Sequence, residues 1–133
     1  MPDQWTYTIK AANELLPWLT EIFQNIEETL EQLKVSEKKL FELGRVIRNN
    51  GRNDVDRQIR QCDDNVRQLR GRIDVVTTEV TAKKIEIRDL RTGLVDFPGL
   101  RESRRIWLCW RVGEPEVSYW HELDVGFSSR QAI

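Results

Sequence analysis

The chain has 133 residues, with 21 basic and 22 acidic side chains and a formal net charge of −1. This length suits one domain with a modest core, and the balanced charge gives no general attraction to nucleic acid or to an anionic membrane. No apolar run approaches the roughly 20 residues of a membrane-spanning helix, and no signal-peptide pattern opens the sequence, so we expect a cytoplasmic protein. Cys62 and Cys109 lie in segments of different kinds, which favours free thiols over a disulfide.

The first predicted element is a helix that begins after Thr8. The Thr8 hydroxyl can accept a hydrogen bond from a backbone N–H group of the first turn, and apolar residues follow at helical spacing. Pro17 lacks a backbone N–H group and clashes with the preceding turn, so we expect a kink or break there. The apolar stripe predicts packing against the C-terminal part of the chain or against a partner.

A long antiparallel helical hairpin is predicted from about residue 22 to residue 80. Apolar residues follow alternating four- and three-residue steps along two segments, which is the heptad pattern of a coiled coil. The sequence Asn49-Asn50-Gly51 ends the first helix, because these residues tolerate a left-handed turn. One register pairs the seam positions of both helices, namely Ile47 with Val55, Gly44 with Ile59, Leu40 with Cys62, Leu33 with Leu69, Leu30 with Ile73, Ile26 with Val76 and Ile22 with Val80.

The charge pattern of this hairpin bears on its partners. The first helix is mainly acidic and the second is rich in arginine, which favours their pairing with each other. A two-helix hairpin buries little surface, so we expect self-association, for example into a four-helix bundle. The arginine-rich helix also suggests nucleic-acid binding, but it has no interleaved aromatic residues and contains several acidic ones, so this reading is the weaker one.

A small antiparallel sheet is predicted for residues 85–133. We expect strands at 85–89, 94–97, 105–112 and 117–121, with Pro98-Gly99 ending the second strand. The predicted fold is therefore α+β: a kinked N-terminal helix, a long coiled-coil hairpin and a small C-terminal sheet. We expect a single domain over 1–133, with a helical part at 8–84 and a β module at 85–133.

Four stretches of the sequence resemble one known family. They are AANELLP near the start, and GLVDFP, LCWRVGEPEVSYWHE and GFSSRQ in order near the end. They are similar to the prokaryotic domain-of-unknown-function family numbered 2203, over nearly the whole chain. The last stretch continues Arg130-Gln131-Ala132, whereas the family pattern often has Arg-Gln-Pro, a departure that affects only the terminus. The resemblance implies a soluble cytoplasmic protein with a helical part and a small C-terminal module, and it implies no established activity or ligand.

The polar candidates for chemistry lie in the β module. Imidazole, thiolate and carboxylate groups are suitable zinc or iron ligands, and the candidate ligands are His121, Glu122, Asp96, Asp89 and Cys109. Their spacing fits no known ligand motif. The loop before the last strand decides whether Cys109 and His121 share a face of the sheet. A loop of two or four residues separates them, and an odd loop such as Gly113–Pro115 brings them together.

On this reasoning His121 with Asp96 or Glu122 is the better ligand combination, and a divalent metal is the cofactor to test. A nucleophilic Cys109 with His121 as its base meets the same difficulty, because a loop of two or four residues would place the two side chains on opposite faces of the sheet. The simpler structural alternative is that His121 hydrogen-bonds to a nearby carboxylate or carbonyl and stabilises the β-hairpin that contains it. A thiolate or two carboxylates around His121 would favour the metal hypothesis.

The leading functional hypothesis is a non-enzymatic scaffold or interaction protein that self-associates through the helical hairpin. Candidate residues for binding a protein partner are Trp107, Trp110, Tyr119, Trp120 and Arg130. The simpler interpretation of the tryptophans is that they form the core of the sheet. The alternative function is a metal-binding protein or a metal-dependent enzyme centred on His121, although enzymatic activity is not favoured.

Overall fold

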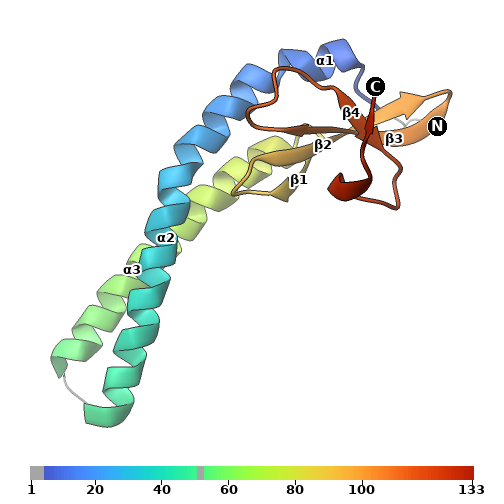
Figure 1. The fold of residues 1–133 in the computed structure, drawn as a ribbon. Helices are drawn as coiled ribbons and strands as arrows, with labels where there is room; N and C mark the ends of the chain where they lie inside the picture. Colours follow the sequence, from blue (N-terminus) through green and yellow to red (C-terminus); the bar gives the residue numbers. More distant parts are fainter. Residues whose placement is uncertain (1–4, 51–52) are drawn as a thin grey trace. The chain divides into compact units, whose positions relative to one another are not determined.

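The computed structural model describes residues 5–50 and 53–133, and it confirms the predicted α+β fold (Figure 1). The chain divides into two compact units. One unit contains residues 1–24 and 77–133, which include helix α1 (Ile9–Glu14) and the whole sheet. The other unit contains residues 25–76, which include most of the two long helices. In the described part of the chain, no helix is both long enough and apolar enough to cross a membrane.

The hairpin is built from helix α2 (Leu16–Asn50) and helix α3 (Asn53–Thr81), which pack against each other. The predicted seam positions of α3 are buried at Cys62, Val66, Leu69 and Ile73. The Cys62 thiol donates a hydrogen bond to the Ser36 carbonyl oxygen at 3.2 Å, and the Asn65 amide donates to the Ser36 hydroxyl at 2.8 Å. Gly51 of the predicted turn and the side chain of Ile47 lie outside the described residues.

The N-terminal segment follows the sequence prediction closely. Thr8 caps helix α1, because its hydroxyl accepts a hydrogen bond from the Ala11 N–H group at 3.0 Å. The predicted break also occurs, since α1 ends at Glu14 and α2 begins at Leu16. Pro17 thus lies in the first turn of α2, where a missing N–H group leaves no helical hydrogen bond unmade.

The sheet contains five antiparallel strands in chain order. The strands are β1 (Glu86–Asp89), β2 (Leu94–Arg101), β3 (Arg104–Arg111), β4 (Tyr119–His121) and β5 (Gln131–Ala132). A short 3₁₀ turn, η1 (Phe127–Ser129), precedes the last strand. Each strand pairs with its sequence neighbour, so the sheet is a simple meander that needs no crossover connection.

The prediction that Pro98-Gly99 ends the second strand is wrong. Strand β2 continues through both residues, and Pro98 pairs with Trp107 of β3. The pairing of β1 with β2 reaches only to Asp96, so Pro98 lies where β2 has become an edge strand. A proline is tolerated at an edge because its missing N–H group breaks no ladder bond. The Pro98 carbonyl oxygen there accepts a hydrogen bond from the Tyr7 N–H group at 2.7 Å.

The two faces of the sheet differ in chemistry because neighbouring residues of a strand point to opposite sides. One face is the apolar core of this unit and carries Val95, Phe97, Ile106, Leu108, Trp110 and Trp120, all buried. The N-terminal segment covers it, as predicted, with the rings of Tyr7 and Phe97 edge to face at 5.2 Å. The opposite face carries the buried polar residues Asp96 and His121.

Candidate metal centre

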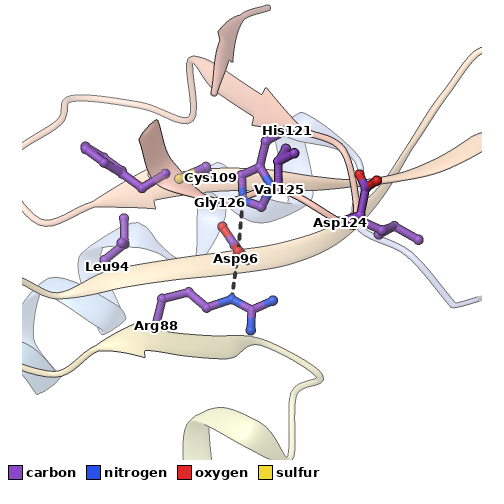
Figure 2. Close-up of a pocket in the computed structure, with 10 residues that line it drawn as sticks. Arg88, Leu94, Asp96, Cys109, His121, Asp124, Val125 and Gly126 are labelled. Atoms are coloured by element: carbon purple, nitrogen blue, oxygen red, sulfur yellow. Dashed lines mark hydrogen bonds and ion pairs between the residues drawn. The ribbon is translucent and has the colours of Figure 1, made fainter. Parts of the chain in front are cut away.

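Strand register brings Asp96, Cys109 and His121 together. Trp107 pairs with His121 and Cys109 pairs with Tyr119, which is the register that an odd loop produces. Cys109 and His121 therefore share a face, two positions apart in register. Asp96 pairs directly with Cys109 on the neighbouring strand. One ligand atom from each of the three residues lies within 4.8 Å of the others, and all three residues are buried (Figure 2).

A β-bulge adds a fourth polar residue to this cluster. The register of β1 against β2 shifts between Ile87 and Asp89, so Arg88 is the extra residue of the bulge. Bulges re-aim a side chain, and here the Arg88 Nε–H group donates to Asp96 Oδ2 at 2.8 Å. In Figure 2 Arg88 and His121 approach Asp96 from opposite sides. The guanidinium of Arg88 also stacks over the Trp107 ring, 5.0 Å from its centroid.

The hydrogen bonds of His121 fix the orientation of its ring. Nδ1 lies 2.9 Å from the Glu122 carbonyl oxygen, which can only accept, so Nδ1 carries a hydrogen and donates it. Nε2 lies 3.0 Å from Asp96 Oδ2. A neutral ring with its hydrogen on Nδ1 directs the Nε2 lone pair at a carboxylate oxygen. A cation, either a proton or a metal ion, is needed between these two atoms.

The remaining atoms of the cluster have few partners, and the Cys109 sulfur has only a long contact from Arg130 Nη1, at 4.0 Å. Asp96 Oδ1 is buried and has no hydrogen-bond partner among the residues that the structure describes. Burial, together with the negative charge of Asp96, raises the pKa of the Cys109 thiol to about 12. The nearby Arg130 guanidinium acts to lower this pKa, but burial and Asp96 outweigh it, so the thiol is protonated at neutral pH in the metal-free chain. Both ring nitrogens of His121 are engaged by oxygen atoms, so His121 is not placed to activate Cys109 as a nucleophile.

The C-terminal segment closes a cavity of about 310 Å³ over this face. Its lining combines the cluster and Arg88 with five consecutive residues of the segment, Leu123, Asp124, Val125, Gly126 and Phe127, and with Leu94. Figure 2 shows Asp124, Val125 and Gly126 on the His121 side of the cavity. The cluster thus faces a cavity that is partly open to solvent, rather than the apolar core.

An ion pair that we call the Arg130 clamp anchors this segment. The guanidinium of Arg130 donates two hydrogen bonds to the Glu114 carboxylate, at 3.0 and 2.7 Å. It also lies 3.9 Å from the centroid of the Tyr119 ring and 4.2 Å from that of Phe127. Partial burial acts to raise the pKa of Glu114, but the hydrogen bonds from Arg130 and from the Arg111 N–H group outweigh it and hold that pKa below its ordinary value.

The other predicted ligands lie outside the cluster. The Asp89 carboxylate accepts a hydrogen bond from the Arg91 N–H group at 2.9 Å and caps the turn between β1 and β2. The Glu122 carboxylate forms a bidentate pair with Arg104, at 3.1 and 2.8 Å, and only its backbone carbonyl contacts His121. The cluster therefore consists of one carboxylate, one thiol and one imidazole.

The predicted partner-binding residues have two kinds of surroundings. Trp110 and Trp120 are buried in the core, and the Trp110 indole donates to the Glu114 carbonyl oxygen at 2.9 Å. Trp107 and Tyr119 are half-buried on the site face, each beneath an arginine guanidinium. The sequence reasoning predicted the strand at 85–89 but did not identify Arg88 or residues 123–127 as parts of the site, because a bulge within a strand leaves no clear signal in a single sequence.

The fold and the cluster define a small α+β protein with a buried Asp–Cys–His site on one face of its sheet. The sequence model of the family DUF2203, described as an uncharacterized conserved protein, matches residues 5–133. The chain belongs to this family. No curated protein and no solved structure matches the chain.

Proposed function

We propose that this protein binds a divalent transition-metal ion, zinc in the first instance, through Asp96, Cys109 and His121. The observation that carries the proposal is the approach of these three buried ligand atoms to within 4.8 Å of one another. In a tetrahedral zinc site with bonds of about 2.0–2.3 Å, ligand atoms lie roughly 3.3–3.6 Å apart, so a small contraction would close the site.

The surroundings of the cluster support a metal over a purely structural role. Metal-bound histidines usually donate their second ring N–H group to a carbonyl or carboxylate, and His121 has this contact with the Glu122 carbonyl. Asp96 Oδ1 is a buried acceptor without a partner among the described residues, and a metal ion would satisfy it. A thiolate, an imidazole and one carboxylate suit zinc or iron better than magnesium or calcium, which prefer oxygen ligands alone.

Three protein ligands leave one coordination position free. Structural zinc sites are closed by four protein ligands, whereas catalytic sites use three and bind water or substrate at the fourth. The cavity beside the cluster supplies room for such a ligand. We therefore propose an open metal site, which has the form of a metal-dependent enzyme that activates water or polarises a bound oxygen.

Metal analysis of protein purified without a chelator tests the proposal, followed by titration of the metal-free chain with Zn²⁺ and Co²⁺. We expect close to one metal ion per chain and a thiolate-to-cobalt charge-transfer band. The Cys109→Ser and His121→Asn variants should bind at least about tenfold more weakly, because each removes one ligand. Cys62→Ser is the matched control, since Cys62 is also buried but lies in the hairpin. Absence of stoichiometric metal from the wild-type chain in both experiments would overturn the proposal.

Self-association through the hairpin is a second candidate, favoured by apolar side chains exposed within residues 25–76. They are Val35, Phe41 and Val75, each more than half exposed. An interface between copies would cover these side chains. Light scattering of wild type and Phe41→Ser tests this. A larger assembly that dissociates in the variant supports it, and a strictly monomeric wild type over a wide concentration range rejects it.

Nucleic-acid binding through the arginine-rich helix stays a weaker prediction. Part of its charge is paired, since Arg67 contacts Asp63 at 3.0 Å and Arg70 contacts Glu37. A gel shift at low salt tests it, because phosphate contacts weaken steeply as salt is added.

We also propose a cytoplasmic location, which the two free cysteines support, since free thiols are typical of a reducing compartment.

A further inference from the structure

Resting on the metal site proposed above, we propose that the cavity takes a small monocarboxylic acid with a short apolar chain. The carboxylate would reach the metal and the Arg88 guanidinium, and the chain would lie against the exposed apolar residues of the C-terminal segment. The cavity of about 310 Å³ is at the small end of ligand pockets, which suits a ligand with a few carbon atoms beyond its carboxylate.

Arg88 supplies the anion-recognising group. Its Nε is used on Asp96 Oδ2, and the Trp107 ring supports its guanidinium plane. Its two Nη groups have no hydrogen-bond partner among the described residues, and the side chain is 42% exposed while lining the cavity. An arginine held by its Nε and by a ring presents its remaining N–H groups in a fixed plane, which suits a planar carboxylate.

The walls of the cavity supply the apolar contacts. Leu123, Val125 and Phe127 line the cavity and belong to the exposed large apolar residues of the chain. The ring of Phe127 is stacked by Arg130 and Arg111, so Leu123 and Val125 supply most of the surface that an apolar ligand would cover. Leu94 extends this surface on the sheet side.

The charges around the cavity favour a monoanion over a dianion. A divalent metal and Arg88 bring three positive charges, and the Cys109 thiolate, Asp96 and Asp124 bring three negative ones. One further negative charge can be stabilised by its direct contacts with the metal and Arg88. A second negative charge would leave an excess of about two negative charges, and Arg88 is the one basic side chain among the described residues that line the cavity, so a phosphate dianion fits less well than a monocarboxylate.

The experiment uses the full chain loaded with Co²⁺, whose visible spectrum reports changes in metal coordination. Acetate, butyrate, hexanoate and inorganic phosphate are titrated separately. We expect saturable spectral changes with the carboxylates. From acetate to butyrate, affinity should rise about threefold to fourfold for each CH₂ group that enters the cavity, because about 0.8 kcal/mol accompanies its burial. Phosphate should bind more weakly than butyrate.

Two variants separate the contributions. Arg88→Gln, compared with wild type at Co²⁺ concentrations that saturate each chain, should weaken butyrate binding about tenfold or more, whereas Arg91→Gln, in the adjacent turn, should leave butyrate binding unchanged. Val125→Ser lies at an exposed position and should reduce the gain from acetate to butyrate without changing acetate affinity. A chain that binds no Co²⁺ overturns the proposed metal site. Stoichiometric Co²⁺ without a response to carboxylates, no dependence on chain length, or tighter binding of phosphate overturns the carboxylate inference alone.

Discussion

Replacing Arg130 with alanine should cost this protein about 3 kcal/mol of its free energy of unfolding. The Arg130 clamp combines a two-point ion pair to Glu114 with stacking between the rings of Tyr119 and Phe127. Both partners of the ion pair are mostly buried, with side-chain exposures of 13% and 17%. Screening by water therefore removes less of this interaction than it would at an exposed pair.

The magnitude follows from these contacts taken in turn. Hydrogen bonds to a charged group contribute about 1.5–3 kcal/mol, and each cation–ring contact at a half-exposed site adds about 0.5–1 kcal/mol. Breaking a fully buried pair costs about 3–5 kcal/mol, largely because one charge is left alone. Glu114 keeps its hydrogen bond from the Arg111 N–H group, so the lower end of that range applies.

Urea unfolding followed by tryptophan fluorescence measures this loss in the right part of the chain. All tryptophans lie within residues 1–24 and 77–133, the unit that contains the clamp. A loss of about 3 kcal/mol lowers the midpoint by on the order of 1–3 M urea at an unchanged slope. The matched control is Arg101→Ala, because Arg101 also stacks on a ring, that of Trp120, but forms no ion pair with a described residue. It should cost less than about 1 kcal/mol.

A double-mutant cycle with Glu114→Ala isolates the ion pair from the stacking. The coupling free energy should be about 2 kcal/mol, because either single substitution already removes the pair. If the two substitutions are additive within about 0.5 kcal/mol, the pair does not stabilise the protein and the reasoning above is wrong.

Three further predictions concern neighbouring residues. The pKa of Glu114 is lowered in the folded chain, so the ionised carboxylate stabilises the fold above its unfolded pKa, and this effect is lost as pH falls through the folded pKa. The difference in unfolding free energy between wild type and Glu114→Gln should therefore shrink on acidification. A difference that stays constant with pH would contradict this. Because the pKa of Cys109 is about 12, iodoacetamide should not alkylate this thiol in the native metal-free protein at pH 8, as read by peptide mass spectrometry; rapid native labelling would contradict its burial. Gly93→Ala should lower the unfolding midpoint by several degrees, because Gly93 has φ +68° and a Cβ would lie 2.3 Å from Val112 Cγ2; an unchanged midpoint would contradict this.

The elements of this fold were predictable because their signals are local or periodic. The Thr8 cap, the break before Pro17 and the seam of α3 each follow from residue type and spacing. The second strand was predicted too short because Pro98 stops a central strand but not an edge strand. Whether Pro98 would lie at an edge depended on where β1 ends, which no local pattern gives.

The sequence pointed to the three residues of the candidate site, together with Asp89 and Glu122 outside it, but not to their geometry. Asp96, Cys109 and His121 were all candidates, yet the facing of Cys109 and His121 depended on one residue of register in the loop before β4. A bulge in β1 directs Arg88 into the site, and residues 123–127 line the site because the chain folds back over the sheet. These features are set by pairing between strands, so the periodicity of one strand could not reveal them.

Stability alone does not account for the composition of this cluster. A buried carboxylate loses its hydration, and well-packed apolar residues in place of buried ionic groups are often as stable or more stable. Asp96 is almost fully buried, but one of its oxygens has no partner among the described residues, and its neighbour Cys109 is made a poorer acid by its presence. His121 can donate a hydrogen bond to Asp96 only when its Nε2 atom carries a hydrogen. A bound cation resolves all three conflicts at once, because it neutralises Asp96, accepts the lone pair of His121 and stabilises the Cys109 thiolate. These three features of the cluster are the physical basis on which we propose that it binds a metal ion.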